Sequence, residues 1–321
     1  MKYYIGIDLG GTNIAAGVVN ENKEIVAKTS IKTGSGRDVN LIVDDMALAA
    51  KTAAEGANLT FDDVEWIGIG APGTANKATG IIEYSNNLDW YNVPLVSMLE
   101  ERTGKKVFIE NDANAAAYGE YVAGAAKDAD SSVMVTLGTG VGGGIVLNNK
   151  IYTGFNFAGA ELGHSVIVVD GRQCTCGRKG CLEAYASATG LIVTTKEYME
   201  QYKDSAMWDI VEGDISKVNG RTAFDAMRKG DEAGKLVVDE YIKYLACGVT
   251  NIINTFQPDI LCIGGGISHE GDTLMVPLKE IVAREVYSRN SARNTEIVAA
   301  SLGNDAGIIG AAPLGLAGWF G

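Results

Sequence analysis

The sequence predicts an α/β protein of two domains, and three observations support this prediction. The chain has 321 residues, enough for two domains of about 150 residues each. Hydrophobic residues make up 46% of the chain, which is sufficient for two buried cores. A pattern of strand, glycine turn, strand and polar turn occurs at the start and again about half a chain later. Such a repeat is typical of duplicated domains.

The first half of the chain alternates strand patterns with helix patterns. Short apolar runs between turns predict strands at residues 3–7, 14–19, 25–27, 66–70 and 107–110. Apolar residues at helical spacing predict helices at residues 39–55, from about residue 94, and at 113–122. In the first of these helices, Leu41, Met46 and Ala50 are expected towards one side. The first two strands are joined by a short glycine turn, which predicts a hairpin.

The second half begins with the same arrangement and then becomes more helical. Apolar runs predict strands at residues 133–137, 145–147, 151–152, 260–263 and 297–299. The pattern predicts surface helices between residues 196 and 235, and further helices at 239–256, 277–289 and 305–316. A glycine turn at residues 138–144 joins the first two of these strands, so a second hairpin is expected.

Charge and composition limit the partners and the compartment. The formal net charge of -13 argues against nonspecific nucleic-acid binding, which needs a basic face. No apolar run approaches the roughly 20 residues of a membrane-spanning helix. A strand pattern begins at the first residues, which leaves no room for a signal peptide. An odd number of cysteines with clustered thiols fits a reducing cytosol, so a cytoplasmic protein is expected.

The stretch between Glu161 and Glu183 has the composition of a metal site. One imidazole and three thiols lie within it, on His164, Cys174, Cys176 and Cys181. Three thiolates and one imidazole are a complete tetrahedral set for Zn²⁺ that leaves no position for water. The sequence therefore predicts a structural zinc site. The alternatives are one disulfide with a spare thiol, or thiols that pack together by chance.

The glycine turns are candidates for phosphate binding. Gly138-x-Gly140-x-x-Gly143 matches the dinucleotide fingerprint, but that motif needs a following helix, and here a strand follows. Two glycine hairpins can instead present backbone N–H groups and the hydroxyls of Thr12 and Thr139 to a polyphosphate. Asp8 could then hold Mg²⁺ directly or through water. The alternative is two ordinary hairpins. A third glycine turn, at residues 264–266, is ambiguous by itself.

Asp112 lies where a strand is expected to end and a helix to begin. An aspartate at such a place ordinarily caps the helix. Phosphoryl transfer also needs a group that accepts the proton of the attacking hydroxyl, and Asp112 is a candidate for this role. Asn111 adds a hydrogen-bonding group beside it. A sugar needs many polar partners, and others at strand ends are Gly73, Asn87, Glu161 and Glu183.

Four motifs together and in this order resemble the ROK family of sugar kinases and repressors, and most closely its bacterial ATP-dependent glucokinases. The motifs are Asp8-Leu9-Gly10-Gly11-Thr12-Asn13, Glu110-Asn111-Asp112-Ala113-Asn114, Leu137-Gly138-Thr139-Gly140-Val141-Gly142-Gly143-Gly144 and Gly163-His164…Cys174-x-Cys176-Gly177-x-x-Gly180-Cys181-x-Glu183. The resemblance implies a two-lobed actin-like, ribonuclease-H-type fold, with ATP and sugar in its cleft. The expected lobes are residues 1–117 plus 303–321 and residues 118–302, which carry the zinc motif.

The resemblance also implies roles for individual residues. Asp112 corresponds to the catalytic base that deprotonates the sugar 6-hydroxyl. The implied sugar contacts are Gly73, Asn87, Asn111, Asp112, Glu161, His164 and Glu183. The implied ATP and Mg²⁺ contacts are Asp8, Gly10, Gly11, Thr12, Asn13, Thr139 and Gly140, with Gly264 and Gly265 on the adenosine side. His164 can serve twice, because one ring nitrogen can bind zinc while the other donates to a sugar hydroxyl.

The function implied by the resemblance is ATP-dependent phosphorylation of glucose to glucose 6-phosphate. Kinases for N-acetylmannosamine, fructose or allose are alternatives, because they share the scaffold and the zinc motif. A sugar-sensing regulator without kinase activity is another. Such repressors carry a DNA-binding segment ahead of the first hairpin, whereas seven residues precede Asp8 here. The resemblance also implies a homodimer or homotetramer.

Overall fold

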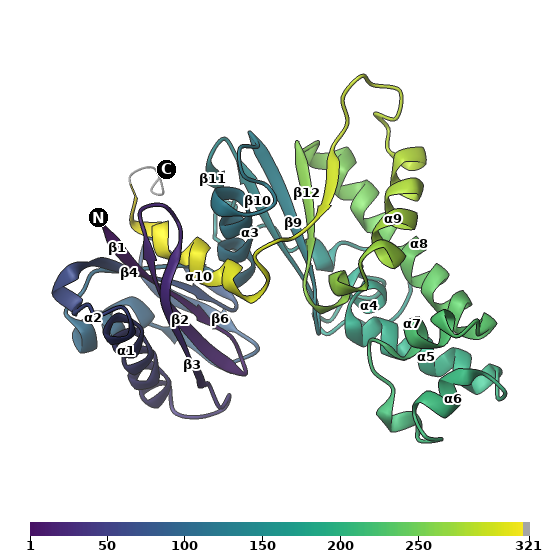
Figure 1. The fold of residues 1–321 in the computed structure, drawn as a ribbon, viewed down its shortest axis with the longest axis horizontal. Coiled ribbons are helices and arrows are strands. Elements are labelled where there is room, and N and C mark those ends of the chain that lie inside the picture. Colours follow the sequence, from purple (N-terminus) through teal and green to yellow (C-terminus); the bar gives the residue numbers. More distant parts are fainter. Residues whose placement is uncertain (317–321) are drawn as a thin grey trace. The chain divides into compact units, whose positions relative to one another are not determined.

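The computed structural model describes residues 1–316, which form two compact units (Figure 1). Unit 1 consists of Met1–Val133, Gly144–Ala160 and the C-terminal segment from Ser301, and unit 2 consists of Met134–Gly143 and Glu161–Ala300. The C-terminal segment thus belongs to unit 1. The lobe boundaries expected from the resemblance stay a prediction, and residues 317–321 of that prediction lie outside the described residues.

The main sheet of unit 1 places three parallel strands side by side. Its order is β3-β2-β1-β4-β8, in which β1 is antiparallel to β2 but parallel to β4, and β4 is parallel to β8. The strand bounds are Tyr3–Leu9 (β1), Asn13–Asn20 (β2), Ile25–Lys32 (β3), Val64–Ala71 (β4) and Val107–Asn111 (β8). The carboxyl ends of β1, β4 and β8 therefore meet at one edge of the sheet, which is where open α/β sheets bind ligands.

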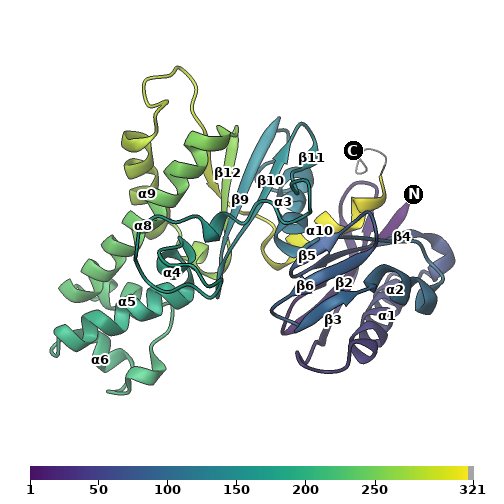
Figure 2. The same ribbon diagram turned by 180° about the vertical axis from the view of Figure 1, so that it is seen from behind.

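Two helices cover one face of this sheet, as Figures 1 and 2 show: α1 (Val39–Gly56) and α2 (Leu95–Thr103). Alternate residues of β1 point into the core beneath them, and Ile5 and Ile7 are fully buried there. The sequence analysis placed Leu41 on the same side of α1 as Met46 and Ala50, which are buried, and this was wrong. Leu41 is 50% exposed, and its neighbour Ile42 is buried instead.

The opposite face of the sheet is lined with glycines, which allow a helix backbone to pack closely. Gly6 of β1 pairs with Gly17 of β2 and with Gly68 of β4. A Cβ atom on Gly6 would overlap the carbonyl of Ile308, which belongs to α10 (Ala306–Ala311). The C-terminal segment therefore completes unit 1 through backbone packing that only glycine permits. Helix α3 (Asp112–Ala123) packs beside α10 (Figure 1).

Unit 1 also contains a small sheet that the sequence analysis did not predict. It has the order β5-β6-β7, with β5 at Thr74–Asn76, β6 at Ile81–Ser85 and β7 at Trp90–Val93. These strands are three to five residues long and two of them alternate little in hydrophobicity. Such short runs give a weak periodic signal.

The second large sheet repeats the order of the first. It is β11-β10-β9-β12-β13, with β9 at Ser131–Leu137, β10 at Val141–Leu147, β11 at Lys150–Ile151, β12 at Ile260–Gly264 and β13 at Glu296–Ala299. In both sheets the first two strands form a hairpin and the third pairs with the second. The fourth strand pairs with the first, and the fifth pairs with the fourth. The expected repeat of hairpin-containing domains is therefore confirmed.

The helices of unit 2 pack around one long helix, α8 (Glu232–Phe256), which contacts α4, α5, α7 and α9 (Figure 1). Their bounds are Glu183–Ala186 (α4), Ala188–Gln201 (α5), Ala206–Ile210 (α6), Thr222–Arg228 (α7) and Asp272–Glu285 (α9). The predicted start of α9 at Pro277 was wrong, because the helix begins at Asp272 and Pro277 lies in its second turn. No helix within residues 1–316 is long and apolar enough to span a bilayer.

Glu120 anchors the point at which the chain re-enters unit 1. Its side chain is 1% exposed and accepts backbone hydrogen bonds from Ala125 at 2.8 Å, Ser301 at 2.9 Å and Leu302 at 2.7 Å. The hydroxyl of Ser301 also donates to it at 3.2 Å. A buried carboxylate with this many donors is a strong structural link.

Glu120→Ala is expected to lower the free energy of unfolding by about 3 kcal/mol or more, because three N–H groups lose a charged acceptor. Equilibrium urea denaturation checks this. Glu120→Gln keeps one carbonyl acceptor and is expected to lie between the alanine variant and the parent. An alanine variant as stable as the parent would show that the link is not stabilising.

Candidate active site

Two carboxylates lie at the carboxyl edge of the main sheet of unit 1. Asp8 is in β1, where it pairs in register with Gly70 of β4, and Asp112 follows β8 directly. Both residues are half-buried. Asp8 points toward the face that α10 covers, since a Cβ on Gly307 would contact its carboxylate at 2.6 Å. The structure therefore brings together the two acidic residues that the sequence singled out 104 positions apart.

Asn111, and not Asp112, caps helix α3. The side chain of Asn111 accepts a hydrogen bond from the backbone N–H of Asn114 at 3.1 Å, which is the capping interaction. Asp112 is the first residue of the helix, and its Oδ1 accepts a hydrogen bond from the adjacent Ala113 N–H at 2.9 Å. Because the cap is supplied by its neighbour, the Asp112 carboxylate is available for chemistry. The ordinary explanation of this aspartate as a helix cap is thus wrong.

Burial raises the pKa values of both carboxylates. Burial is the larger cause for Asp8, and the negative charge of Asp112 adds to it, so that the pKa of Asp8 is raised to about 6. Burial likewise raises the pKa of Asp112, although hydrogen bonds from Ala113 and Asn111 oppose the shift. Paired acids whose environment raises their pKa are typical of functional sites.

Asp8→Asn is expected to raise the free energy of unfolding at pH 8 by about 1–3 kcal/mol, because folding no longer buries this charge beside a second carboxylate. The folded-state pKa lies above the usual value of 3.8. The parent therefore loses stability as the pH rises through about 4 to 6, and the variant does not. Urea denaturation without Mg²⁺ or nucleotide should give a larger difference at pH 8 than at pH 5.

The control for that experiment is Asp62→Asn, at an exposed position of unit 1. It should change the free energy of unfolding little, because the side chain is exposed. Two results would contradict the conclusion that folding buries the charge of Asp8. One is an Asp8→Asn variant less stable than the parent, and the other is an equal gain in the free energy of unfolding at pH 5 and pH 8.

The first glycine turn closes a tight hairpin between β1 and β2. The N–H of Gly10 donates to the carbonyl of Asn13 at 2.9 Å, and Thr12 is exposed at the tip. The carbonyls of the turn are held from outside the hairpin. Thr33 donates its hydroxyl to Gly10 at 2.6 Å, and Ser35 donates to Gly11. The sequence analysis missed these two hydrogen bonds. The only available signal was that Thr33 and Ser35, which carry hydroxyl groups, follow shortly after β3.

Two further residues that the sequence analysis singled out are Gly73 and Asn87. Gly73 lies beside the turn that carries Asp112, and Asn87 lies beside this hairpin. Gly73 has φ of 103°, and a Cβ there would overlap the carbonyl of Tyr84, so only glycine fits. Its carbonyl accepts from the side chain of Asn111 at 3.1 Å. Asn87 is exposed and its backbone lies beside Gly11. The unit 1 residues predicted to bind sugar and phosphate are therefore neighbours.

The second glycine turn is built like the first and belongs to unit 2. The N–H of Gly138 donates to the carbonyl of Gly140 at 3.0 Å, and Thr139 is exposed at the tip. Its carbonyls are again held from outside, because the Thr189 hydroxyl donates to Thr139 at 2.8 Å and the Ala188 N–H donates to Gly138 at 2.8 Å. In both hairpins the carbonyls are occupied, which suits presentation of N–H groups and hydroxyls to an anion.

The third glycine turn lies beside the second. Gly265 has φ of 84°, and a Cβ there would contact the backbone of Leu137 at 2.5 Å. Gly264 is buried against Met134 of the same neighbouring strand, β9. The turn that sequence reasoning left ambiguous is therefore packed directly against the base of the Thr139–Gly140 hairpin.

The predicted metal ligands gather into one cluster in unit 2. The ligand atoms of His164, Cys174, Cys176 and Cys181 all lie within 4.8 Å of one another. Cys176 Sγ and Cys181 Sγ are 3.7 Å apart, and His164 Nδ1 and Cys174 Sγ are 3.6 Å apart. Tetrahedral Zn²⁺ with ordinary bond lengths places two sulfurs about 3.8 Å apart and a sulfur and nitrogen about 3.6 Å apart. The cluster is compatible with structural zinc.

Each end of the cluster presents a carboxylate. His164 directs Nδ1 at the sulfurs, and its Nε2 lies 4.0 Å from the carboxylate of Glu161. Glu183 accepts hydrogen bonds from the Thr175 hydroxyl at 3.1 Å and from the N–H of Val141 at 2.9 Å. Glu183 thereby joins the cysteine cluster to the second glycine hairpin, a link that the spacing of the motif did not reveal.

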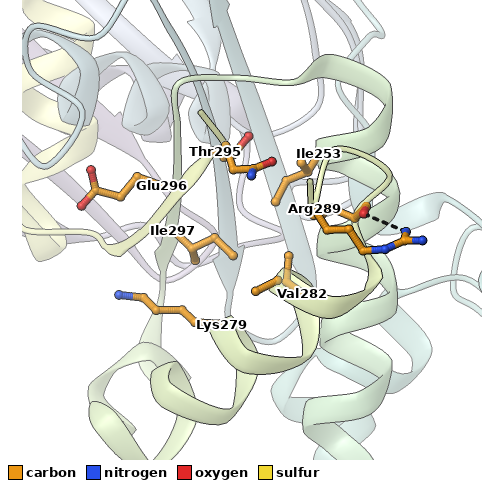
Figure 3. Close-up of a pocket in the computed structure, with 10 residues that line it drawn as sticks. Ile253, Lys279, Val282, Arg289, Thr295, Glu296 and Ile297 are labelled. Atoms are coloured by element: carbon orange, nitrogen blue, oxygen red, sulfur yellow. Dashed lines mark hydrogen bonds between the residues drawn. The ribbon is translucent and has the colours of Figure 1, made fainter. Parts of the chain in front are cut away.

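Unit 2 also has a pocket of about 280 Å³ that none of these residues lines (Figure 3). Its apolar walls come from Ile253 of α8, Val282 of α9 and Ile297 of β13. Lys279 and Glu296 add charged groups at its border. The structure shows no polar side chain buried in it that lacks a partner, so it remains a pocket without an assigned ligand.

Comparison with known proteins agrees with this geometry. The sequence pattern of the ROK family matches residues 4–317. A glucokinase of Thermotoga maritima is 40% identical over 311 residues, which cover 97% of this chain and 96% of that protein. The crystal structure of a ROK family glucokinase from Streptomyces griseus, in complex with glucose and AMPPNP, is 36% identical with a TM-score of 0.83. The alignment covers 97% of this chain and 98% of that chain.

The similarity also extends to regulators. The xylose repressor of Bacillus subtilis is 33% identical over 246 residues, which cover 76% of this chain and 59% of the repressor. The expected α/β fold of the actin-like type, with duplicated hairpins and a His/Cys₃ cluster, is confirmed. The match to the family pattern covers nearly the whole chain, and the chain therefore belongs to the ROK family.

Proposed function

We propose that this protein is a glucokinase, which transfers the γ-phosphoryl group of ATP to the 6-hydroxyl of glucose. The observation that carries the proposal is the placement of Asp112, a carboxylate at the carboxyl edge of the sheet that is not used as a helix cap. The glucokinase of Thermotoga maritima and the glucose-bound structure from Streptomyces griseus support the choice of reaction and substrate.

Unit 1 supplies the base and half of the phosphate contacts in this proposal. Asp112 accepts the proton of the 6-hydroxyl while the sugar oxygen attacks the γ-phosphorus and ADP leaves. Burial raises the pKa of Asp112, which makes it a stronger base than an exposed aspartate. Asn111 and Gly73 fix the turn that carries it. The hairpin Gly10–Asn13 binds the phosphates of ATP through N–H groups and the Thr12 hydroxyl, and Asp8 would hold the Mg²⁺ that neutralises their charge.

Unit 2 supplies the remaining contacts. Thr139 and Gly140 bind phosphate, and Gly264 and Gly265 lie on the adenosine side. Glu161, His164 and Glu183 bind sugar hydroxyls. Zinc held on Nδ1 of His164 would fix the ring so that Nε2 carries the hydrogen and donates it to a hydroxyl. The cysteine cluster therefore orients a sugar contact and takes no part in phosphoryl transfer.

A coupled ADP-release assay over a panel of sugars tests the proposal. The panel contains glucose, fructose, allose, mannose, N-acetylglucosamine and N-acetylmannosamine. Glucose is expected to give the highest kcat/KM. A higher value for an N-acetylhexosamine would assign the protein to another substrate of the same reaction class.

The similarity to a xylose repressor makes sugar sensing without catalysis the second candidate. Binding of a sugar, measured by calorimetry, with no ADP formed from any member of the panel would favour it. Formation of ADP that depends on glucose would exclude it.

A further inference from the structure

Two buried polar atoms beside Asp112 have no hydrogen-bond partner. They are Oε2 of Glu110 and Oδ1 of Asn114, and each belongs to a side chain that is only 2% exposed. Both atoms are hydrogen-bond acceptors when the glutamate is ionised. A buried acceptor without a donor costs free energy, so two such atoms in neighbouring side chains need an explanation.

The same two side chains are already joined through their other polar atoms. Nδ2 of Asn114 donates to Oε1 of Glu110 at 3.1 Å. Oε1 also accepts the N–H of Asn111 at 2.9 Å. An ionised Glu110 can accept only these donors, and it leaves Oε2 and Oδ1 unsatisfied. A proton on Oε2 would make Glu110 a donor as well as an acceptor. In a carboxylic acid–amide pair this donor bonds the amide oxygen, while the amide N–H bonds the carboxyl C=O, which is the bond seen here between Nδ2 and Oε1.

We propose that Glu110 is a neutral carboxylic acid in the folded protein, paired with Asn114, and that this pair is a positioning element for Asp112. The chain order explains why the pair matters. Glu110 ends the buried part of β8, Asn114 lies in the first turn of α3, and Asp112 lies between them. The pair therefore ties together the strand and the helix on either side of Asp112.

The electrostatic surroundings agree with a protonated Glu110. Burial is the main influence on its pKa and raises it, while the hydrogen bonds from Asn111 and Asn114 and the charge of Lys77 oppose the shift. A neutral Glu110 also has a consequence for Asp112. A second buried negative charge two residues away would favour protonation of Asp112, and a neutral acid avoids this while keeping the turn hydrogen-bonded.

Infrared spectroscopy tests the protonation state without requiring any activity. The difference spectrum between the parent and Glu110→Gln at pH 8 is expected to contain the C=O stretching band of a protonated carboxyl group. Asp8 does not contribute to this difference, because both proteins contain it. A difference spectrum that shows only the bands of an ionised carboxylate would overturn the proposal.

Kinetics tests the positioning role, and this part of the test rests on the proposed kinase function. Glu110→Gln places a carbonyl at Oε1 and an NH₂ donor at Oε2, so it reproduces the neutral acid and should keep kcat within about threefold of the parent. Glu110→Leu has a similar volume but cannot accept from Asn111 or Asn114. It is expected to lower kcat by about tenfold to 100-fold, with the KM for ATP unchanged, because the base is misplaced.

The results distinguish a failure of the proposed kinase function from a failure of the proposed Glu110–Asn114 pair. A protein with no kinase activity at all contradicts the proposed function, while the infrared result still decides the state of Glu110. A Glu110→Gln variant as impaired as Glu110→Leu would show that the negative charge is required, and would overturn the neutral pair. If Glu110→Leu does not fold, the infrared spectrum and the activity of Glu110→Gln still decide it.

Discussion

Asp112→Asn is expected to lower kcat by about 10²–10⁴-fold while glucose still binds, because the amide cannot accept the proton of the sugar hydroxyl. The substitution keeps the shape of the side chain and the cap on α3, since that cap is supplied by Asn111. The effect should therefore fall on turnover and not on folding. Steady-state kinetics and calorimetric titration with glucose measure the two quantities separately.

A matched control is available at the start of another helix of unit 1. Asp38 caps α1 and accepts from the N–H of Asn40 at 2.8 Å. Asparagine caps helices as well as aspartate, so Asp38→Asn should leave stability and kcat nearly unchanged. If Asp112→Asn turned over glucose at a near-normal rate, the assignment of the base would be wrong, however well the protein bound sugar.

Cys181→Ser is expected to abolish zinc binding and to weaken glucose binding by about tenfold or more, because the metal no longer orients His164. Cys181 is fully buried within the cluster, 3.7 Å from Cys176. Atomic absorption measures zinc content, and calorimetry measures the glucose affinity. Cys176→Ser should behave in the same way.

Cys247→Ser is the control for this experiment, because Cys247 lies in α8 and does not belong to the cluster. It should retain zinc and glucose affinity. A Cys181→Ser variant that lost zinc but bound glucose like the parent would reduce the cluster to a support for the fold. A variant that kept its zinc would remove Cys181 from the ligand set.

The sequence predicts the large elements well because they are long and strongly patterned. Strand β1 is a short apolar run, and helix α8 has an apolar face at helical spacing. Each pattern fits only one type of element. The errors occur where local patterns compete. In α1, Leu41 and Ile42 are adjacent apolar residues, and only packing against the sheet decides that Ile42 is buried. In α9, Pro277 is a typical first residue of a helix, but tertiary packing extends the helix beyond it.

In the candidate site too, some residues could be predicted from the sequence and others depend on tertiary packing. Asp8 and Asp112 could be singled out because each lies at the end of a predicted strand. The cysteine cluster could be predicted because its residue types and spacing suit a metal ion. The side chains that hold them could not. Thr33 braces the first hairpin from 23 positions away. Glu110 and Asn114 look like ordinary polar residues until burial shows that two of their atoms lack partners.

We propose above that the protein phosphorylates glucose at its 6-hydroxyl with ATP. Nuclear magnetic resonance of carbon-13-labelled glucose, incubated with the protein, ATP and Mg²⁺, tests it most directly, with the Asp112→Asn variant as the blank. Glucose 6-phosphate and ADP are expected to form in equal amounts. Glucose that stays unchanged, or that carries its phosphate at another position, would contradict it.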